Sequence, residues 1–222
     1  MLASAPVSPL LSRPAPLAAL TRLSGSGRLL LLLAGLLGYG LSLRLMIAAQ
    51  VGVAPWEVLH LGLSGRSGLR VGEVSILVGL VLLAYTRLKL GERLGVGTLL
   101  NVLLIGVFLD AFAPLIHTPA ALAGRWAQFL LGLTLLGLAT GAYVGAGLGA
   151  GPRDGLMLGL NRVYGWPVSR IRTVVELMVL ALGTALGGPL GWGTLVFALL
   201  AGPSMAWGLR LFGVEKGAKE SK

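Results

Sequence analysis

The sequence predicts an all-α integral membrane protein made of two copies of one helical unit. Hydrophobic residues fill 55% of its 222 positions and charged residues only 12%, about half the share found in soluble domains. Six apolar stretches approach the roughly 20 residues that a helix needs to cross a bilayer. The two halves also share one order of glycine, proline and acidic residues, which predicts an internal duplication.

The duplication is visible when residues 51–71 are placed over residues 148–168, at an offset of 97 positions. Beyond residue 95 the offset becomes 96, and the string GVGT meets GWGT. Composition alone does not easily produce so many matches in one order. The matched helix-break and acidic positions are Gly52 with Gly149, Pro55 with Pro152, and Glu57 with Asp154.

Each copy is expected to hold three spanning helices and one short segment. The short segments, 54–66 and 151–163, would each be about 20 Å long as helices, too short for a hydrocarbon core of about 30 Å. We therefore predict re-entrant half-helices, and an odd number of crossings inverts the second copy, as in many transporters. The predicted crossings are 29–48, 71–86, 97–116, 126–146, 173–190 and 194–212.

The ends of the chain are expected to lie outside this membrane unit. Residues 1–27 are rich in Pro, Ser and Ala, which predicts a disordered tail. A cleaved signal peptide ending near Ala48-Ala49 is the alternative, but residues 28–48 have a counterpart deep inside the chain. The predicted organisation is a tail at 1–27, a first repeat at 28–116, a second repeat at 125–212 and a tail at 213–222.

The distribution of Lys and Arg predicts that both termini are cytoplasmic. With six crossings, 14 of the 18 basic residues fall inside and 3 outside, as the positive-inside rule requires. With eight crossings the same rule gives 13 inside and 4 outside. Charge therefore leaves the number of crossings open, and the shortness of the two segments favours six.

Composition also excludes several classes of protein. The net charge of +10 does not indicate nucleic-acid binding, because the cations lie between apolar runs. There is no cysteine, and His60 and His117 are far apart, so we expect no metal site and no cofactor. The expected partners are the lipid bilayer and an unidentified small molecule, and homo-oligomers remain open.

Four strings in the chain resemble a known family. They are GVAPWEVLHLGLS, GVGTLLNVLLIG, GAGLGAGPRDGLMLGL and GWGTLVFALLAGP, and they are similar to the YczE group of bacterial membrane proteins, related to the YitT-type families. The resemblance covers residues 28–212. It implies a polytopic inner-membrane protein from a group usually described as uncharacterised and sometimes placed with exporters. Ala54 and Glu57 stand where the resemblance implies Ser and Asp.

The two Gly-Pro breaks are the main candidate site. Gly52 and Gly149 let the backbone leave a helix, and Pro55 and Pro152 suit the first turn of the next one. The N-terminal ends of such half-helices meet near the midplane in inverted-repeat transporters. Alternatively, each break is a tight turn at the membrane surface, with Glu57 and Asp154 as ordinary first-turn acids.

Arg44 is the second candidate. It aligns with Gly141, within a run of small residues at every fourth position that indicates close helix packing. By that analogy Arg44 faces the bundle and lies in a functional site. Alternatively, it lies near the outer helix end and extends to the headgroups.

Four other polar residues are secondary candidates for the site, although a structural role is favoured for each. Arg172 and Glu176 can form an i,i+4 pair, Asn101 can join helices, and Asp110 can mark a membrane boundary. The string around Ser64 resembles an intramembrane-protease motif. Its repeat partner is Asn161, so we do not expect an enzyme.

The sequence therefore favours a secondary transporter or permease-like protein, and the expected substrate-binding residues are Arg44, Glu57, Arg153 and Asp154. The alternative is a non-catalytic membrane scaffold or accessory subunit.

Overall fold

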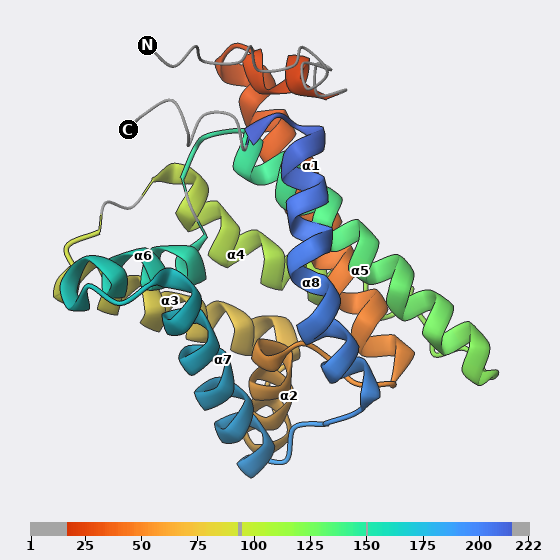
Figure 1. The fold of residues 1–222 in the computed structure, drawn as a ribbon. Coiled ribbons are helices and arrows are strands. Elements are labelled where there is room, and N and C mark those ends of the chain that lie inside the picture. Colours follow the sequence, from red (N-terminus) through yellow and green to blue (C-terminus); the bar gives the residue numbers. More distant parts are fainter. Residues whose placement is uncertain (1–16, 93–94, 150, 215–222) are drawn as a thin grey trace, which may run out of the picture.

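A computed structural model of the chain describes residues 17–92, 95–149 and 151–214, and these residues are helical throughout apart from turns and loops. A short 3-10 helix at Ala18–Arg22 precedes the first long helix (Figure 1). The α-helices are α1 (Gly25–Ala49), α2 (Pro55–Ser67), α3 (Val71–Lys89), α4 (Val96–Ala111), α5 (Leu122–Gly145), α6 (Pro152–Tyr164), α7 (Val168–Ala185) and α8 (Trp192–Leu211).

The helix order repeats the pattern of the sequence, one long helix, one short helix and two further helices. The short helices α2 and α6 have 13 residues each and begin at Pro55 and Pro152. Each ends at a glycine in the left-handed conformation, Gly68 (φ 74°) and Gly165 (φ 69°), the usual way to terminate a helix. The predicted short segments are therefore helices of equal length with matching ends.

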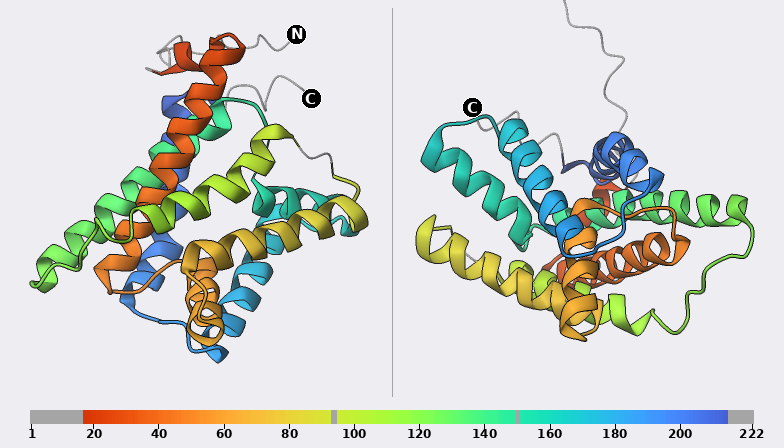
Figure 2. Two further views of the ribbon diagram at one scale, coloured as in Figure 1. Left: turned by 180° about the vertical axis from the view of Figure 1, so that it is seen from behind. Right: turned by 90° about the horizontal axis from the view of Figure 1, so that it is seen from below.

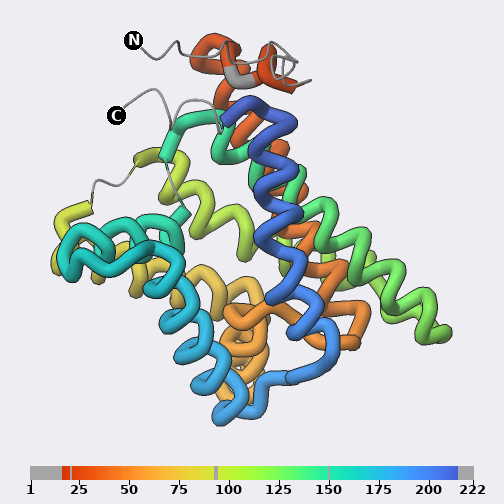
Figure 3. The backbone as a smooth tube through the Cα atoms, viewed as in Figure 1, coloured from red at the N-terminus to blue at the C-terminus, as the bar shows by residue number. Residues whose placement is uncertain are grey.

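The N-terminal boundary differs from the prediction. Helix α1 begins at Gly25, inside the tail predicted at 1–27, and follows Ser24 as its N-terminal capping residue. The amide of Leu17 also donates a hydrogen bond to the Leu211 carbonyl (2.9 Å), so the described chain ends lie together (Figure 3). Residues 1–16 and 215–222 of the two predicted tails lie outside the described residues.

The helices form two groups, each with its own hydrophobic core. Helices α1, α4, α5 and α8 cross one another around Leu36, Leu43, Phe129 and Leu136. Helices α2, α3, α6 and α7 gather on one side of them, around Trp56 and the apolar faces of α6 and α7. Figures 1 and 2 show the two groups from opposite directions.

The duplication extends to the tertiary contacts. The amide of Gly193 donates to the Val51 carbonyl (2.7 Å), and the amide of Gly97 donates to the Leu148 carbonyl (2.9 Å). Val51 and Leu148 are repeat partners, and so are Gly97 and Gly193. The break before each short helix thus lies against the last helix of the other copy. In Figure 1, α1 runs away from the described chain ends, whereas its partner α5 runs toward them.

Small residues allow α1 and α5 to approach closely. A Cβ at Gly35 would lie 2.6 Å from the Tyr143 nitrogen, and a Cβ at Gly132 would lie 2.9 Å from Met46 Cγ. Gly35 pairs with Gly132 in the repeat, and Met46 with Tyr143. The same backbone approach therefore occurs twice, as expected where membrane helices pack through small residues.

Within the described residues, four helices are long and apolar enough to cross a membrane, namely α1, α3, α5 and α8. Helix α4 is apolar but has only 16 residues. Helix α7 has 18 residues and carries Arg170, Arg172 and Glu176. All six predicted crossings are helices, and by length and composition four of them qualify as spans.

The break before α2 gives a direct test of this fold. Gly52 has φ 121°, and a Cβ there would lie 2.7 Å from the Thr194 nitrogen. We expect Gly52→Ala to lower the free energy of unfolding by about 2 kcal/mol, through backbone strain and displacement of α8. Thermal unfolding in detergent measures the loss. Gly65→Ala is the control, since a Cβ there meets nothing within 4 Å, and an unchanged melting temperature for Gly52→Ala would contradict the described contact.

Candidate functional site

The first turns of α2 and α6 face each other near the centre of the molecule. Proline opens each helix, and an acid follows in the first turn, Glu57 in α2 and Asp154 in α6. The Arg153 guanidinium lies 4.8 Å above the ring centroid of Trp56, its own repeat partner. The duplication thus brings two equivalent positions into contact, with a cation on one and an aromatic ring on the other.

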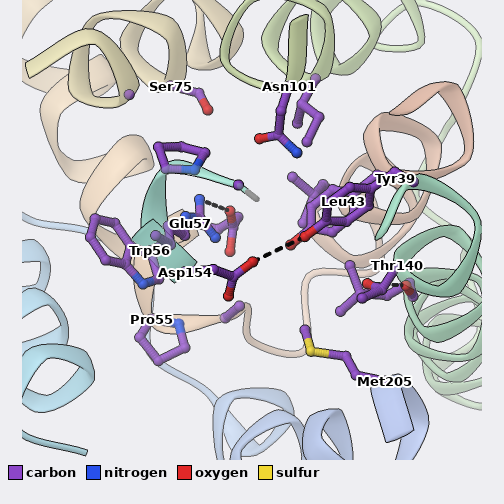
Figure 4. A pocket seen from close by; sticks show the side chains of 18 of the residues that line it. Tyr39, Leu43, Pro55, Trp56, Glu57, Ser75, Asn101, Thr140, Asp154 and Met205 are labelled. Atoms are coloured by element: carbon purple, nitrogen blue, oxygen red, sulfur yellow. Dashed lines mark hydrogen bonds and ion pairs between the residues drawn. The ribbon is translucent and has the colours of Figure 1, made fainter. Parts of the chain in front are cut away.

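A cavity of about 500 Å³ lies beside these two helix ends and is lined by residues of all eight helices. Most of its wall is apolar, including Leu43, Val78, Ile105 and Phe197. Figure 4 shows the polar groups that project into it, among them Ser75, Asn101 and Thr140. An apolar chamber with a few convergent polar groups is the usual form of a small-molecule site.

One ion pair and one hydrogen bond organise the charges in the cavity. Arg153 Nη2 donates to Glu57 Oε1 at 3.2 Å, and the Glu57 side chain is only 1% exposed. The Tyr143 hydroxyl donates to Asp154 Oδ2 at 3.2 Å. Tyr39 packs edge-on against Tyr143, with the ring centroids 6.0 Å apart. The two first-turn acids therefore have different surroundings, since Glu57 is buried and Asp154 is exposed.

Two atoms at the buried end of the cavity have no hydrogen-bond partner. They are Glu57 Oε2 and His60 Nδ1. His60 is 1% exposed, and its Nδ1 lies 3.8 Å from Glu57 Oε1, beyond hydrogen-bond distance. Because an unpaired buried polar atom is costly, this pair marks a place where a proton or a ligand can be bound.

The two copies differ in how their last two helices meet. Gly106 of α4 packs so closely on α3 that a Cβ there would lie 2.6 Å from Ile76 Cγ1. Its repeat partner Gly202 on α8 is exposed, and a Cβ there meets nothing within 4 Å. Helices α3 and α4 are in extensive contact, whereas α7 and α8 scarcely touch.

The cavity reaches the surface between α7 and α8. Its more exposed lining includes Arg172 and Glu176, with side chains 47% and 29% exposed, and Gly202 of α8. At the related position between α3 and α4 the wall is closed by Gly79 and Val102, both buried. The cavity is therefore open between α7 and α8 and closed between α3 and α4, the corresponding helices of the first copy.

The structure brings together three of the four predicted binding residues. Glu57, Arg153 and Asp154 all line the cavity. Arg44 lies apart from it, and its Nη2 donates to the carbonyls of Ala113 (3.2 Å) and Ile116 (3.4 Å), just beyond the end of α4. Its alignment with a glycine in a packing run indicated an inward position but not which neighbour it contacts.

The four secondary candidates occupy different places. Asn101 is buried and lines the cavity. Asp110 accepts a hydrogen bond from the Gly72 amide (2.8 Å) at the start of α3, a position in which a carboxylate stabilises a helix. Arg172 and Glu176 form an i,i+4 pair at 2.9 Å on the open side of the cavity.

Sequence reasoning did not assign His60, Tyr39, Tyr143 or Trp56 to the site. His60 lies three residues after Glu57, on the same face of α2, and this spacing was an available signal. The two tyrosines come from long apolar helices, where nothing in the sequence distinguishes a site residue from a packing residue. Their meeting depends on the crossing of α1 and α5.

Ser64 is engaged at the end of its helix. Its hydroxyl donates to the Leu69 carbonyl at 2.6 Å, and the Asn161 amide donates to the Trp166 carbonyl at 2.7 Å. Ser64 corresponds to Asn161 in the repeat, and Leu69 corresponds to Trp166. Ser64 therefore stabilises the turn after its helix in the same way as Asn161. Across residues 17–92, 95–149 and 151–214, no three His, Asp or Glu side chains are grouped so that they could hold a metal ion.

Comparison with known proteins gives a family but no activity. The model of a family described as "Family of unknown function (DUF6198)" matches residues 26–210. The chain is 40% identical over 167 residues to the uncharacterized membrane protein YczE of Bacillus subtilis, covering 75% of this chain and 77% of the relative. It is 38% identical over 159 residues to an uncharacterized protein of Haemophilus influenzae, covering 71% and 72%. No solved structure matches the chain.

Proposed function

The chain belongs to the DUF6198 family of unknown function, and we propose that it is a secondary transporter, with its binding site in the cavity between α2 and α6. The observation that carries this proposal is the difference between the two copies. A chamber open between α7 and α8, and shut between their partners α3 and α4, has the form required for alternating access.

The proposal includes six crossings, in two inverted copies, and both termini in the cytoplasm of a bacterial inner membrane. The opposite directions of α1 and α5 support inversion (Figure 1). The excess of basic residues on the side of the termini supports the orientation. In this arrangement the described state is open toward the cytoplasm.

Transport would require the two copies to exchange their packing. Helix α7 would close on α8 as α3 now closes on α4, and α3 would then separate from α4. Glu57 and Asp154 would exchange their buried and exposed positions, while Arg153 remains between them. Cargo bound beside these charges would thereby be exposed to the opposite side. A scaffold protein has no need of this second state.

Paired cysteines test the exchange without knowledge of the substrate, because the natural chain has no cysteine. Gly79 and Val102 touch across α3 and α4, with 3.5 Å from a Cβ built at Gly79 to Val102 Cβ, within the range of a disulfide. Their repeat partners are Glu176 and Ala198. We expect Gly79→Cys/Val102→Cys to cross-link readily, and Glu176→Cys/Ala198→Cys to cross-link progressively as the second state is visited.

The two pairs control each other, since they occupy the same positions in the two copies. Non-reducing electrophoresis of membranes treated with an oxidant measures both cross-links over time. If the α3–α4 pair reacts fully and the α7–α8 pair never does, the molecule is static. The scaffold alternative would then be preferred.

A further inference from the structure

We infer that Glu57 and His60 together bind one proton, which resides on the Glu57 carboxyl and is shared with His60 Nδ1. This inference rests on the proposed function, because it assigns the coupling ion of the same site. Of the three buried side-chain atoms without a hydrogen-bond partner in the described part of the chain, Arg44 Nε lies apart from the cavity, and the inference starts from the other two, Glu57 Oε2 and His60 Nδ1. Both residues are 1% exposed, and both line the cavity.

A proton satisfies both atoms at once. Glu57 Oε2 is an acceptor without a donor, and a neutral imidazole nitrogen is either a donor or an acceptor. With a proton on Oε2, the carboxyl becomes a donor. The two side chains approach to 3.8 Å, from Glu57 Oε1 to His60 Nδ1, so sharing the proton requires a rotation of the carboxyl that turns Oε2 toward Nδ1. The proton comes from the surrounding solution, and it neutralises the negative charge of Glu57.

The surrounding charges decide which residue of the pair carries the proton. The titratable groups that face the pair in the cavity wall are Tyr39 of α1, Tyr143 of α5, Arg153 and Asp154 of α6, and Arg172 and Glu176 of α7. Helices α3, α4 and α8 contribute no titratable side chain to this wall. Arg153 makes a second positive charge on a buried His60 unfavourable. A neutral carboxyl with a neutral imidazole is therefore the protonated form.

A metal ion is a poorer fit than a proton. Hard cations take six or more oxygen ligands, and Glu57 Oε2 is the one carboxylate oxygen without a partner that is also buried, within residues 17–92, 95–149 and 151–214. The part of the chain that the structure describes also holds no group of three possible metal ligands. A site with one free oxygen and one free nitrogen is suited to a proton.

Protonation has a direct consequence for Arg153. The 3.2 Å contact between Arg153 and Glu57 depends on the carboxylate charge, and a neutral Glu57 holds the guanidinium less strongly. Arg153 is then available to Asp154 or to a bound cargo. Proton binding thus neutralises Glu57 and leaves the positive charge of Arg153 available in the cavity.

Infrared difference spectroscopy on the purified full-length protein tests the inference. The difference between the spectra at acidic and at neutral pH is expected to contain the carbonyl band of a protonated carboxyl. This band should be absent from the difference spectrum of Glu57→Gln. Glu176→Gln is the matched control, because Glu176 lines the same cavity on its open side, and it should retain the band. A wild-type spectrum with no band that depends on Glu57 would overturn the inference.

A second variant keeps the test valid if Glu57→Gln fails to fold. His60→Leu removes the hydrogen-bond partner, and we expect the Glu57 band to move to higher frequency. An unmoved band would show that His60 takes no part. The cysteine cross-links test the exchange of packing independently of the proton site. If the α7–α8 pair cross-links but no band depends on Glu57, the proton site is rejected and the transporter proposal stands.

Discussion

Replacing Arg153 with glutamine is expected to lower the free energy of unfolding by about 3 kcal/mol. Glu57 is almost completely buried and lies 3.2 Å from the Arg153 guanidinium, so the variant leaves a buried carboxylate without its cation. Removing one partner of a buried pair costs more than the pair contributes, because the remaining charge stays desolvated. Thermal unfolding in detergent at neutral pH measures the change.

The double variant Glu57→Gln/Arg153→Gln is the control for this prediction. Removing both charges removes the desolvation cost, and we expect most of the lost stability to return. The coupling between the two single changes then gives the interaction of the pair. If both single variants are as stable as the wild type, Glu57 and Arg153 do not form the described pair. A double variant that regains stability is still expected not to transport, since both charges are proposed to bind the cargo.

Gly208→Val is expected to be the most damaging single change on α8. A Cβ at Gly208 would overlap the carbonyl group of Gly137 on α5, so valine forces the two helices apart. Overpacking costs about 1–3 kcal/mol where side chains can move, and more where backbone must move. Here the obstacle is backbone, and we expect at least the upper value. The yield of folded protein after membrane extraction and its melting temperature report the effect.

Gly202→Val separates this packing effect from the general cost of valine in a helix. Gly202 lies on the same helix, and a Cβ there meets nothing within 4 Å, so the variant should fold with nearly the natural melting temperature. Equal losses in both variants would contradict the close approach of α5 and α8. The same change adds bulk where α7 is proposed to close, so it should slow the Glu176→Cys/Ala198→Cys cross-link.

Arg44 and its repeat partner Gly141 make different contacts, so the repeat alignment did not predict the neighbours of Arg44. Its partner Gly141 packs on α8, where a Cβ would lie 2.6 Å from the carbonyl carbon of Gly208. Arg44 instead extends to the carbonyls of Ala113 and Ile116, which end the turn after α4. A cation at such a position interacts favourably with free carbonyl groups. The contact supports a structural role for Arg44 and separates it from the acids of the cavity.

The sequence by itself determined the class of protein, the duplication and the two short helices. These depend on local information, since apolar length, Gly-Pro breaks and a fixed offset are read directly along the chain. The same offset correctly related Glu57 to Asp154 and Ser64 to Asn161. It did not determine the number of crossings, because charge counting gives nearly the same result for six and for eight.

Only the tertiary structure decided which residues share the cavity and that the two copies differ. Contacts such as Arg153 with Trp56, or Tyr143 with Asp154, join helices whose crossing is set by the packing of glycine faces over the whole bundle. The closed pair α3–α4 and the open pair α7–α8 have related sequences, so no local pattern distinguishes them. The difference between the two pairs is therefore a property of the folded state.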